Sequence, residues 1–268
     1  MELSIVLGAY QFIGFHVCKY LLDQGIEVLG VDWTEDSPDS DPIIEEKQME
    51  IGRNSNFTYL QLNQLEANAG TSKTTLFISW YDVIKARNSM DKGVKNTIQN
   101  LINKFHERAE RPRIVLLYPL GCGDEEKIST ADQIIYLPTI YGPWQHENMV
   151  FEQGIRSNSA AKLKSALEDE YTLDAIYIND LLDSFENMLS QAEKKIIARS
   201  SLEDQWALAA RELFDTPMID EVAPGQIGTK EATGYVYHVK NNMTPKQGIE
   251  RQKQHHKRQE LLRRWESR

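Results

Sequence analysis

Cysteine and long apolar runs are both scarce in this sequence. Its 268 residues include two cysteines, Cys18 and Cys122, and neither has a second cysteine nearby, so the sequence predicts neither a disulfide framework nor a zinc motif. No run approaches the roughly 18 apolar residues needed to span a membrane. The chain also enters its first predicted strand without a basic leader. These absences predict a protein of the reducing cytoplasm with no membrane partner.

Positive charge is also in deficit. The formal net charge is −10, from 30 Lys and Arg against 40 Asp and Glu, which argues against a general nucleic-acid binder. The charge is unevenly spread, because residues 246–268 carry eight Lys or Arg and three Glu. That stretch therefore has a net charge of +5, and −15 remains for the other residues.

The basic stretch 246–268 is rich in Glu, Lys, Gln and Arg, which favour a helix. Three interpretations stay open for it. The helix is docked by Ile249 and then projects into solvent, or it binds an acidic protein surface, including that of a second copy of the chain. The third interpretation is a contact with nucleic acid or an anionic membrane.

The first 33 residues predict a strand, a helix and a second strand. Apolar runs and helical spacing place these elements at 3–7, 12–23 and 26–31. Gly25 follows the helix, where a left-handed cap is favoured. Asp32 follows the second strand, 18 residues after Gly14. This distance is close to the roughly 20 residues expected of a ribose-binding acid in a dinucleotide-binding fold.

The turn between the first strand and the helix has two of the three glycines of a dinucleotide-binding turn. Gly8 and Gly14 hold the positions that make the tight turn and let helix and strand pack closely. Gln11 holds the middle position, where glycine lets the backbone reach the pyrophosphate. The sequence GAYQFIG resembles the GxxGFIG turn of the extended short-chain dehydrogenase/reductase family, which includes the nucleotide-sugar epimerases and dehydratases.

This resemblance implies that the chain binds a dinucleotide. Asp32 fits a free ribose 2′-hydroxyl, which favours NAD over NADP. The alternative for Asp32 is a solvated acid at the end of a strand. Asn63 replaces the Asp that the family places near the adenine. The residues expected to bind the cofactor are Gly8, Tyr10, Gln11, Phe12, Ile13, Gly14, Asp32, Trp33, Asn63 and Ser79.

Four later segments resemble the same family. GVKNTIQNLI, in a predicted helix at 90–106, is similar to NVxGTxNLL. IIYLPTIYGPWQ at 134–145 is similar to RPxNVYGPxQ, with Tyr136 and Thr139 in place of the family's Arg and Asn. AIYINDLLDSFENML at 175–189 is similar to VHVDDVAEA, and there we expect Asn179 to cap a helix. TPKQGIE at 244–250 is similar to TPLEEGI.

Further strands are predicted at 57–62, 75–80 and 113–117, with helices between them. This alternation predicts an α/β, doubly wound parallel-sheet Rossmann fold, with a small C-terminal substrate lobe and a basic terminal helix. The expected domains are an NAD-binding domain at 1–142, a reduced substrate lobe at 143–245 that is interleaved with the sheet, and the basic helix at 246–268.

The catalytic group of the family is missing from its usual place. Family members use a Tyr-x-x-x-Lys pair between strands five and six, together with a Ser or Thr at the end of strand five. Here Tyr118 and Pro119 fill the Ser/Thr positions, and only residues 124–133 separate the two strands. A parallel crossover usually needs about a dozen residues or more. The sequence therefore predicts an atypical, shortened member that lacks this helix.

Three side chains are weak candidates for a substitute acid or base. Tyr81 and Lys85 form the chain's Tyr-x-x-x-Lys spacing at the end of strand four, although one such spacing arises easily by chance among eleven tyrosines. Tyr118 leaves strand five at the same edge, where an ordinary core or rim aromatic is the alternative. Cys122 has no His near it in sequence, which argues against a nucleophile.

Two functions remain open from the sequence. The first is an NAD-binding protein without the standard catalytic group, acting as a binding or regulatory protein. The second is an active NAD-dependent epimerase, dehydratase or reductase that acts on a nucleotide-sugar-like substrate with a non-standard acid or base. The loss of the crossover helix favours the first, and the preserved IYGPWQ and YINDLL segments favour the second.

Overall fold

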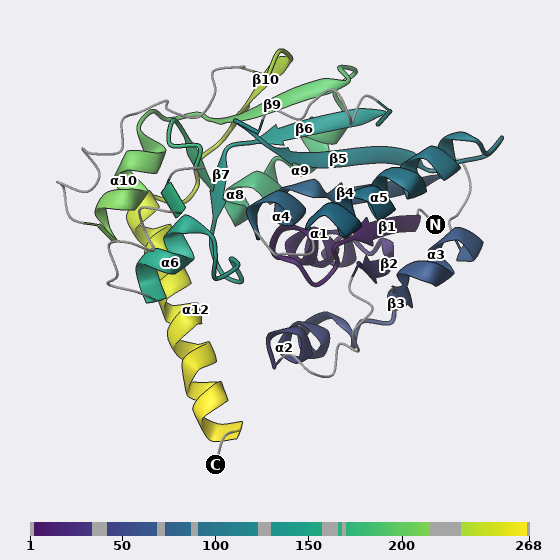
Figure 1. Ribbon diagram of the computed structural model, residues 1–268. Helices are drawn as coiled ribbons and strands as arrows, with labels where there is room; N and C mark the ends of the chain where they lie inside the picture. The colour runs from purple at the N-terminus through teal and green to yellow at the C-terminus, as the bar shows by residue number, and fades with distance from the viewer. Residues whose placement is uncertain are drawn as a thin grey trace. The chain divides into compact units, whose positions relative to one another are not determined.

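The computed structural model describes residues 3–33, 42–68, 73–86, 91–122, 130–156, 166–167, 170–214 and 232–266. In these residues, eight strands form one mostly parallel sheet with flanking helices (Figure 1). This is the Rossmann-like α/β fold that the sequence predicted. The chain divides into two compact units: residues 1–118 with 125–134, and residues 119–124 with 135–268.

The first unit is built around β1, a central strand. Parallel pairing gives the strand order β3-β2-β1-β4-β5 in this unit. Leu7 of β1 pairs with Val31 of β2 and with Ile78 of β4, so these three strands end at the same edge of the sheet. The strands are β1 (Leu3–Leu7), β2 (Glu27–Asp32), β3 (Phe57–Gln61), β4 (Thr74–Ser79) and β5 (Arg113–Pro119).

Helix α1 packs against β1, β2 and β4 and contacts α4. Its apolar face is buried, with Ile13 and Phe15 at 0% exposure, because this face covers the sheet. Gly25 has a φ of 73°, as expected after the helix end. The helices of this unit are α1 (Phe12–Asp23), α2 (Pro42–Ile51), α3 (Leu62–Asn68), α4 (Trp80–Lys85) and α5 (Asp91–His106).

The predicted bounds of β1 and α1 are confirmed, and small errors occur at other strand ends. Leu62 and Trp80 were predicted as the last residues of strands, but each begins a helix. Ser79 has a ψ of 71°, so the backbone turns out of β4 there and becomes the N-cap of α4. Because apolar residues suit both a strand end and a buried helix start, the pattern did not separate the two.

The second unit contains two pairs of parallel strands. Thr139 pairs with Ala175 in the sheet of β7 and β8, and Tyr235 pairs with Ile196 where β10 meets β9. Its strands are β6 (Gln133–Leu137), which begins in the first unit, β7 (Thr139–Tyr141), β8 (Ala175–Tyr177), β9 (Lys195–Ser200) and β10 (Tyr235–Val239). Its helices are α6 (Val150–Arg156), α8 (Ile178–Asp183), α9 (Phe185–Leu189), α10 (Gln205–Arg211) and α12 (Pro245–Glu266).

The predicted cap at Asn179 is wrong. Tyr177 is the N-cap of α8, and Asn179 is the second residue of this helix. The strand β8 continues directly into the helix, so the capping position falls two residues earlier than the side-chain chemistry suggested. Asp180 lies in the first turn, as expected, and accepts a hydrogen bond from Met243 N at 3.3 Å.

The basic C-terminal stretch forms helix α12, which contacts α10, α6 and β7. Ile249 and Gln252 are each 1% exposed, whereas Leu261 and Leu262 further along are 48% and 38% exposed. The docked side of the helix therefore extends from Ile249 to Gln259, which is 8% exposed, so more of the helix packs than in the interpretation that had it docked by Ile249 alone. Binding of an acidic protein surface by the basic helix at 246–268 stays a prediction. None of the helices in the described ranges is long and apolar enough to cross a membrane.

Candidate functional site

Several of the predicted cofactor residues gather where β1, β2 and β4 end. The backbone amides of Gly8 and Ala9 donate to Val31 O at 2.8 and 3.1 Å, which ties the turn after β1 to the end of β2. Asp32 is the next residue of β2, and Ser79 is the last residue of β4. In an open α/β sheet, ligands bind at the carboxyl ends of the strands, so this edge is the candidate site.

The two glycines of the turn have the roles expected of them. Gly8 has a φ of +93°, a conformation that residues with a Cβ rarely adopt. A Cβ on Gly14 would lie 1.9 Å from Gly8 O, so only glycine lets α1 approach the turn this closely. The local geometry of a dinucleotide-binding turn is therefore present at its first and last positions.

Gln11, in the middle position, turns its side chain toward Asp32. The Asp32 carboxylate accepts hydrogen bonds from Gln11 Nε2 at 3.0 Å and from Tyr10 N at 2.8 Å. Asp32 is only 3% exposed, so the alternative of a solvated strand-end acid is wrong. Burial raises the pKa of Asp32, and the hydrogen bonds from Gln11 and Tyr10 and the charge of Lys47 partly offset this effect.

Asp82 holds the N-terminus of α1. Its carboxylate accepts hydrogen bonds from Ile13 N at 2.9 Å and Gly14 N at 3.2 Å, and Ser79 Oγ donates to it at 2.5 Å. Asp82 is 1% exposed, and burial raises its pKa to about 6 despite these bonds and the charge of Lys47. Sequence reasoning missed Asp82. The one local signal was an Asp three residues after the strand-end Ser79.

Two further side chains shape this edge of the sheet. The ring of Trp33 lies against Gly8, since a Cβ built there would be 2.7 Å from Trp33 Cζ3. Lys47 of α2 is 4% exposed, donates to Tyr10 O at 2.6 Å and lies 5.4 Å from the ring centre of Phe15. Sequence reasoning also missed Lys47, because nothing in its neighbourhood marks it as a buried lysine.

The other predicted cofactor residues are spread over this unit. Phe12 and Ile13 are the first two residues of α1 and are 2% and 0% exposed. The ring of Tyr10 stacks on the ring of Tyr59, with 5.1 Å between the ring centroids. Asn63 is exposed on α3, just beyond the end of β3. No described contact joins Asn63 to the turn.

The weak catalytic candidates are all buried. Tyr81 and Lys85 lie on α4 and are 1% and 8% exposed, and Tyr118 of β5 is 1% exposed. Cys122 is partly exposed. The link at 124–133, where the family carries its Tyr-x-x-x-Lys helix, lies mostly outside the described residues. Within the described ranges, no group of three or more His, Cys, Asp or Glu could hold a metal ion.

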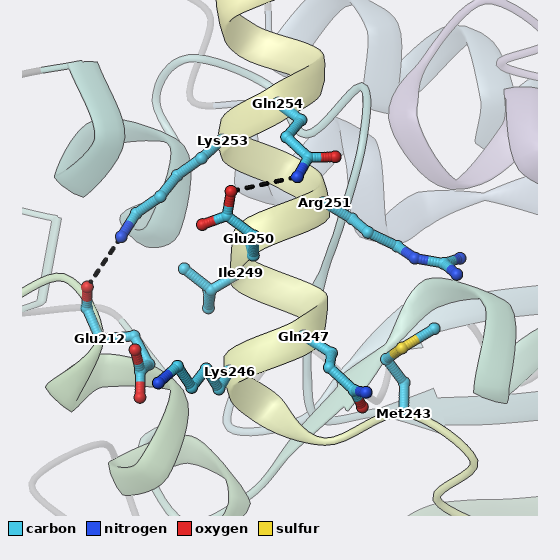
Figure 2. A pocket seen from close by; sticks show the side chains of 9 residues that line it. All are labelled: Glu212, Met243, Lys246, Gln247, Ile249, Glu250, Arg251, Lys253 and Gln254. Carbon is cyan, nitrogen blue, oxygen red and sulfur yellow. Dashed lines mark hydrogen bonds between the residues drawn. The ribbon is translucent and has the colours of Figure 1, made fainter.

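A pocket of about 390 Å³ lies in the second unit, along the first turns of α12 (Figure 2). Its lining mixes acidic and basic side chains, including Glu212, Lys246, Glu250 and Arg251. Lys253 Nζ donates to Glu212 O at 3.0 Å across it. None of the predicted cofactor or catalytic residues lines this pocket.

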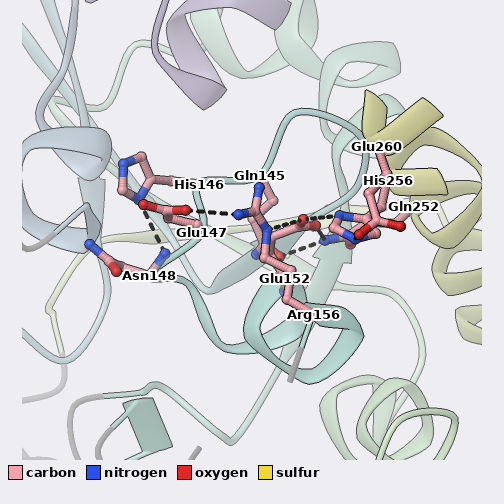
Figure 3. Close-up of polar contacts among 9 residues, drawn as sticks. All are labelled: Gln145, His146, Glu147, Asn148, Glu152, Arg156, Gln252, His256 and Glu260. Carbon is pink, nitrogen blue, oxygen red and sulfur yellow. Dashed lines mark hydrogen bonds and ion pairs between the residues drawn. The ribbon is translucent and has the colours of Figure 1, made fainter. Parts of the chain in front are cut away.

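Glu152 is the centre of a buried polar network that docks α12 (Figure 3). Glu152 is 4% exposed and is bonded to Arg156 Nε at 2.9 Å, His256 Nδ1 at 2.8 Å and Gln252 Nε2 at 3.1 Å. Burial raises the pKa of Glu152, but these three partners outweigh burial and hold the pKa below its ordinary value. Gln252 Nε2 also donates to Gln145 Oε1 at 2.8 Å. The IYGPWQ segment therefore supports the terminal helix.

Comparison with known proteins shows similarity in fold to solved structures of low sequence identity. No family model matches the chain, and no curated protein matches it. The structure is similar to UDP-glucuronic acid 4-epimerase from Bacillus cereus in complex with a UDP-sugar analogue and NAD, with a TM-score of 0.63 and 16% identity over 97% of this chain and 100% of that one. It is also similar to dTDP-glucose 4,6-dehydratase from Bacillus anthracis in complex with NAD, with a TM-score of 0.58 and 11% identity over 97% and 98%.

A third similar structure is UDP-glucose 4-epimerase from Thermotoga maritima with UDP-glucose, with a TM-score of 0.55 and 13% identity over 96% of this chain and 99% of that one. At these identities the likeness concerns the fold. The resemblance read from the GAYQFIG turn and the later segments is confirmed at that level. The chain has the fold of the NAD-dependent epimerases and dehydratases of the extended short-chain dehydrogenase/reductase family.

Proposed function

We propose that this chain is an NAD-binding protein with an epimerase/dehydratase fold that acts as a binding or regulatory protein. One observation carries the proposal: the amides of Ile13 and Gly14, at the start of α1, both donate hydrogen bonds to the carboxyl group of Asp82, which is an anion when ionised. The N-terminus of a helix favours an anion, because its first amides lack partners within the helix and the helix dipole is positive there. Dinucleotide-binding folds place the pyrophosphate at this position.

The residues around this position fit the rest of a dinucleotide. Asp32 ends β2, where an acid can bind the ribose hydroxyls and disfavour the 2′-phosphate of NADP. Gly8 and Gly14 keep the turn close to the sheet. Bound NAD would supply hydride-transfer chemistry, and the chain's own residues would hold its diphosphate and adenosine ribose. The three similar structures, two of them in complex with NAD, support this assignment.

In this proposal the chain lacks the Tyr-x-x-x-Lys pair that serves as the acid/base group of the family. General acid–base catalysis needs a titrating group within hydrogen-bond reach of the substrate. The candidates Tyr81 and Tyr118 are each 1% exposed, and Pro119 stands where the family has a Ser or Thr. Burial of both tyrosines supports binding without turnover. A nucleotide-sugar-like molecule is the second ligand that we propose, since two of the similar structures hold a UDP-sugar or its analogue.

The test is titration calorimetry of the purified protein with NAD and NADH. We expect binding, and we expect Asp32→Ala to weaken it by about 1 kcal/mol or more, the scale of a lost hydrogen bond to a charged group. Asp23→Ala is the matched control, because Asp23 is an exposed acid at the other end of α1. Absence of binding at millimolar NAD and NADH would contradict the proposal.

Turnover distinguishes a binding protein from an enzyme. The protein is incubated with NAD and either UDP-glucose or UDP-glucuronic acid, and the sugar nucleotides are then separated by chromatography. We expect that neither sugar nucleotide is converted. Conversion that is stopped by Tyr81→Phe or Tyr118→Phe would show that a buried tyrosine is catalytic. That result would replace the binding role by the enzyme role.

A further inference from the structure

We propose that Asp82 is a built-in competitor of the dinucleotide, whose carboxylate must leave the N-terminus of α1 before a diphosphate can bind there. This inference rests on the proposed function, and it concerns the regulation of the same site. It predicts that the ligand-free protein holds its own site closed. The ligand class is a nucleoside diphosphate, represented by NAD.

The first argument is that Asp82 uses the donors that a diphosphate would need. Ile13 N donates to both carboxylate oxygens of Asp82, at 3.2 and 2.9 Å, and Gly14 N donates to Oδ2 at 3.2 Å. These are the second and third amides of α1, the ones that a capping group normally satisfies. Gln11 stands at the N-cap but makes no capping hydrogen bond with its side chain. Asp82, 69 residues away in sequence, replaces it.

The second argument is electrostatic. A carboxylate and a diphosphate carry charge of the same sign, and both would lie within hydrogen-bond distance of the same two amides. Their repulsion is strong in a buried site, because little water screens it, and Asp82 is 1% exposed. The two groups therefore exclude each other from this position.

The third argument is that neighbouring side chains hold the closed arrangement. Ser79 Oγ donates to Asp82 Oδ2 at 2.5 Å and fixes the orientation of the carboxylate. The Trp33 ring lies against Gly8, and Gln11 Nε2 donates to Asp32 Oδ1 at 3.0 Å. Side chains of the protein itself thus occupy all three positions. Trp33 covers the turn at Gly8, Asp82 binds the N-terminus of α1, and Gln11 binds Asp32.

The decisive experiment compares NAD binding by the wild type and Asp82→Ala in titration calorimetry. We expect the variant to bind NAD at least tenfold more tightly, because the competitor is gone and two amides are free. Asp23→Ala, at the exposed end of the same helix, should bind as the wild type does. Equal NAD affinity of the wild type and Asp82→Ala would overturn the inference and leave the proposed function intact.

Two milder variants keep the test valid if Asp82→Ala does not fold. Asp82→Asn keeps the shape of the side chain and removes its charge, so it should bind NAD more tightly than the wild type. Ser79→Ala keeps the charge and removes the hydrogen bond that orients it, so it should give a smaller gain. Unchanged NAD affinity in both folded variants would overturn the inference.

A second probe separates this inference from the choice of NAD. Inorganic pyrophosphate is added to ¹⁵N-labelled protein while the amide signals of Ile13 and Gly14 are followed by NMR. We expect these signals to move with pyrophosphate in Asp82→Asn at concentrations that leave the wild type unchanged. If they do so while no protein binds NAD, the proposed function fails and the inference stands. If they move in neither protein, the inference fails.

Discussion

The buried carboxylate of Asp82 predicts that the chain becomes more stable as the pH falls from about 7.5 to about 5. Burial raises the pKa of Asp82 to about 6 in the folded chain, from an ordinary value of 3.8. Between these two values the folded state binds more protons than the unfolded state. The free energy of unfolding therefore rises as the pH falls through this range, and the gain is complete below the unfolded pKa.

The size of the effect follows from the two pKa values. A difference of about two pH units between them corresponds to about 3 kcal/mol over the whole range. Between about pH 7.5 and about pH 5, the same linkage relation gives a gain of about 1.4 kcal/mol. The charge of Lys47 lowers the pKa of Asp82. Lys47→Met should therefore move the midpoint of the stability change to higher pH.

The measurement is urea unfolding of the wild type and Asp82→Asn across this pH range. Asp174, whose pKa burial also raises to about 6, contributes a change of the same sign to both proteins. The informative quantity is thus the difference between the two stability curves, which should change by about 1.4 kcal/mol. Parallel curves would refute the reasoning, because they would mean that the folded state does not hold a buried, titrating carboxylate at α1.

Two further predictions concern packing and buried hydrogen bonds. Gly14→Ala should destabilise the fold by about 3 kcal/mol or more, because the added Cβ would lie 1.9 Å from Gly8 O. Gly93→Ala in helix α5 is the control, because its Cβ would meet nothing within 4 Å, and it should be neutral or slightly stabilising. Thermal unfolding compares the two variants, and similar melting temperatures would contradict the contact between Gly14 and Gly8. Gln252→Ala should cost about 2 kcal/mol or more by removing three buried hydrogen bonds, while Gln254→Ala removes one exposed bond and should change little. Amide hydrogen exchange in α12 measures the difference between the two variants, and exchange should be faster in Gln252→Ala. Equal protection of α12 in both variants would be evidence against the hydrogen-bond network of Glu152 and Gln252.

The sequence predicted the features that local physics controls. Apolar periodicity placed β1 and α1 at their observed bounds, because burial of one face imposes its spacing on the chain. The glycine pattern predicted a tight turn at Gly8 and a close contact at Gly14, since both requirements are backbone geometry within a few residues. Resemblance in several segments predicted the fold of the whole chain.

The tertiary structure decided which groups meet. Asp82 reaches α1 from 69 residues away, and Gln252 reaches Gly142 N from 110 residues away. Such partners depend on strand order and register, which a residue pattern does not encode. The sequence placed Tyr81 and Lys85 at the end of strand four, and only the tertiary structure showed that they lie on helix α4 and that both are buried. The sequence thus predicted where an anion could bind, and the tertiary structure placed the chain's own carboxylate of Asp82 there, because β4 ends beside the start of α1.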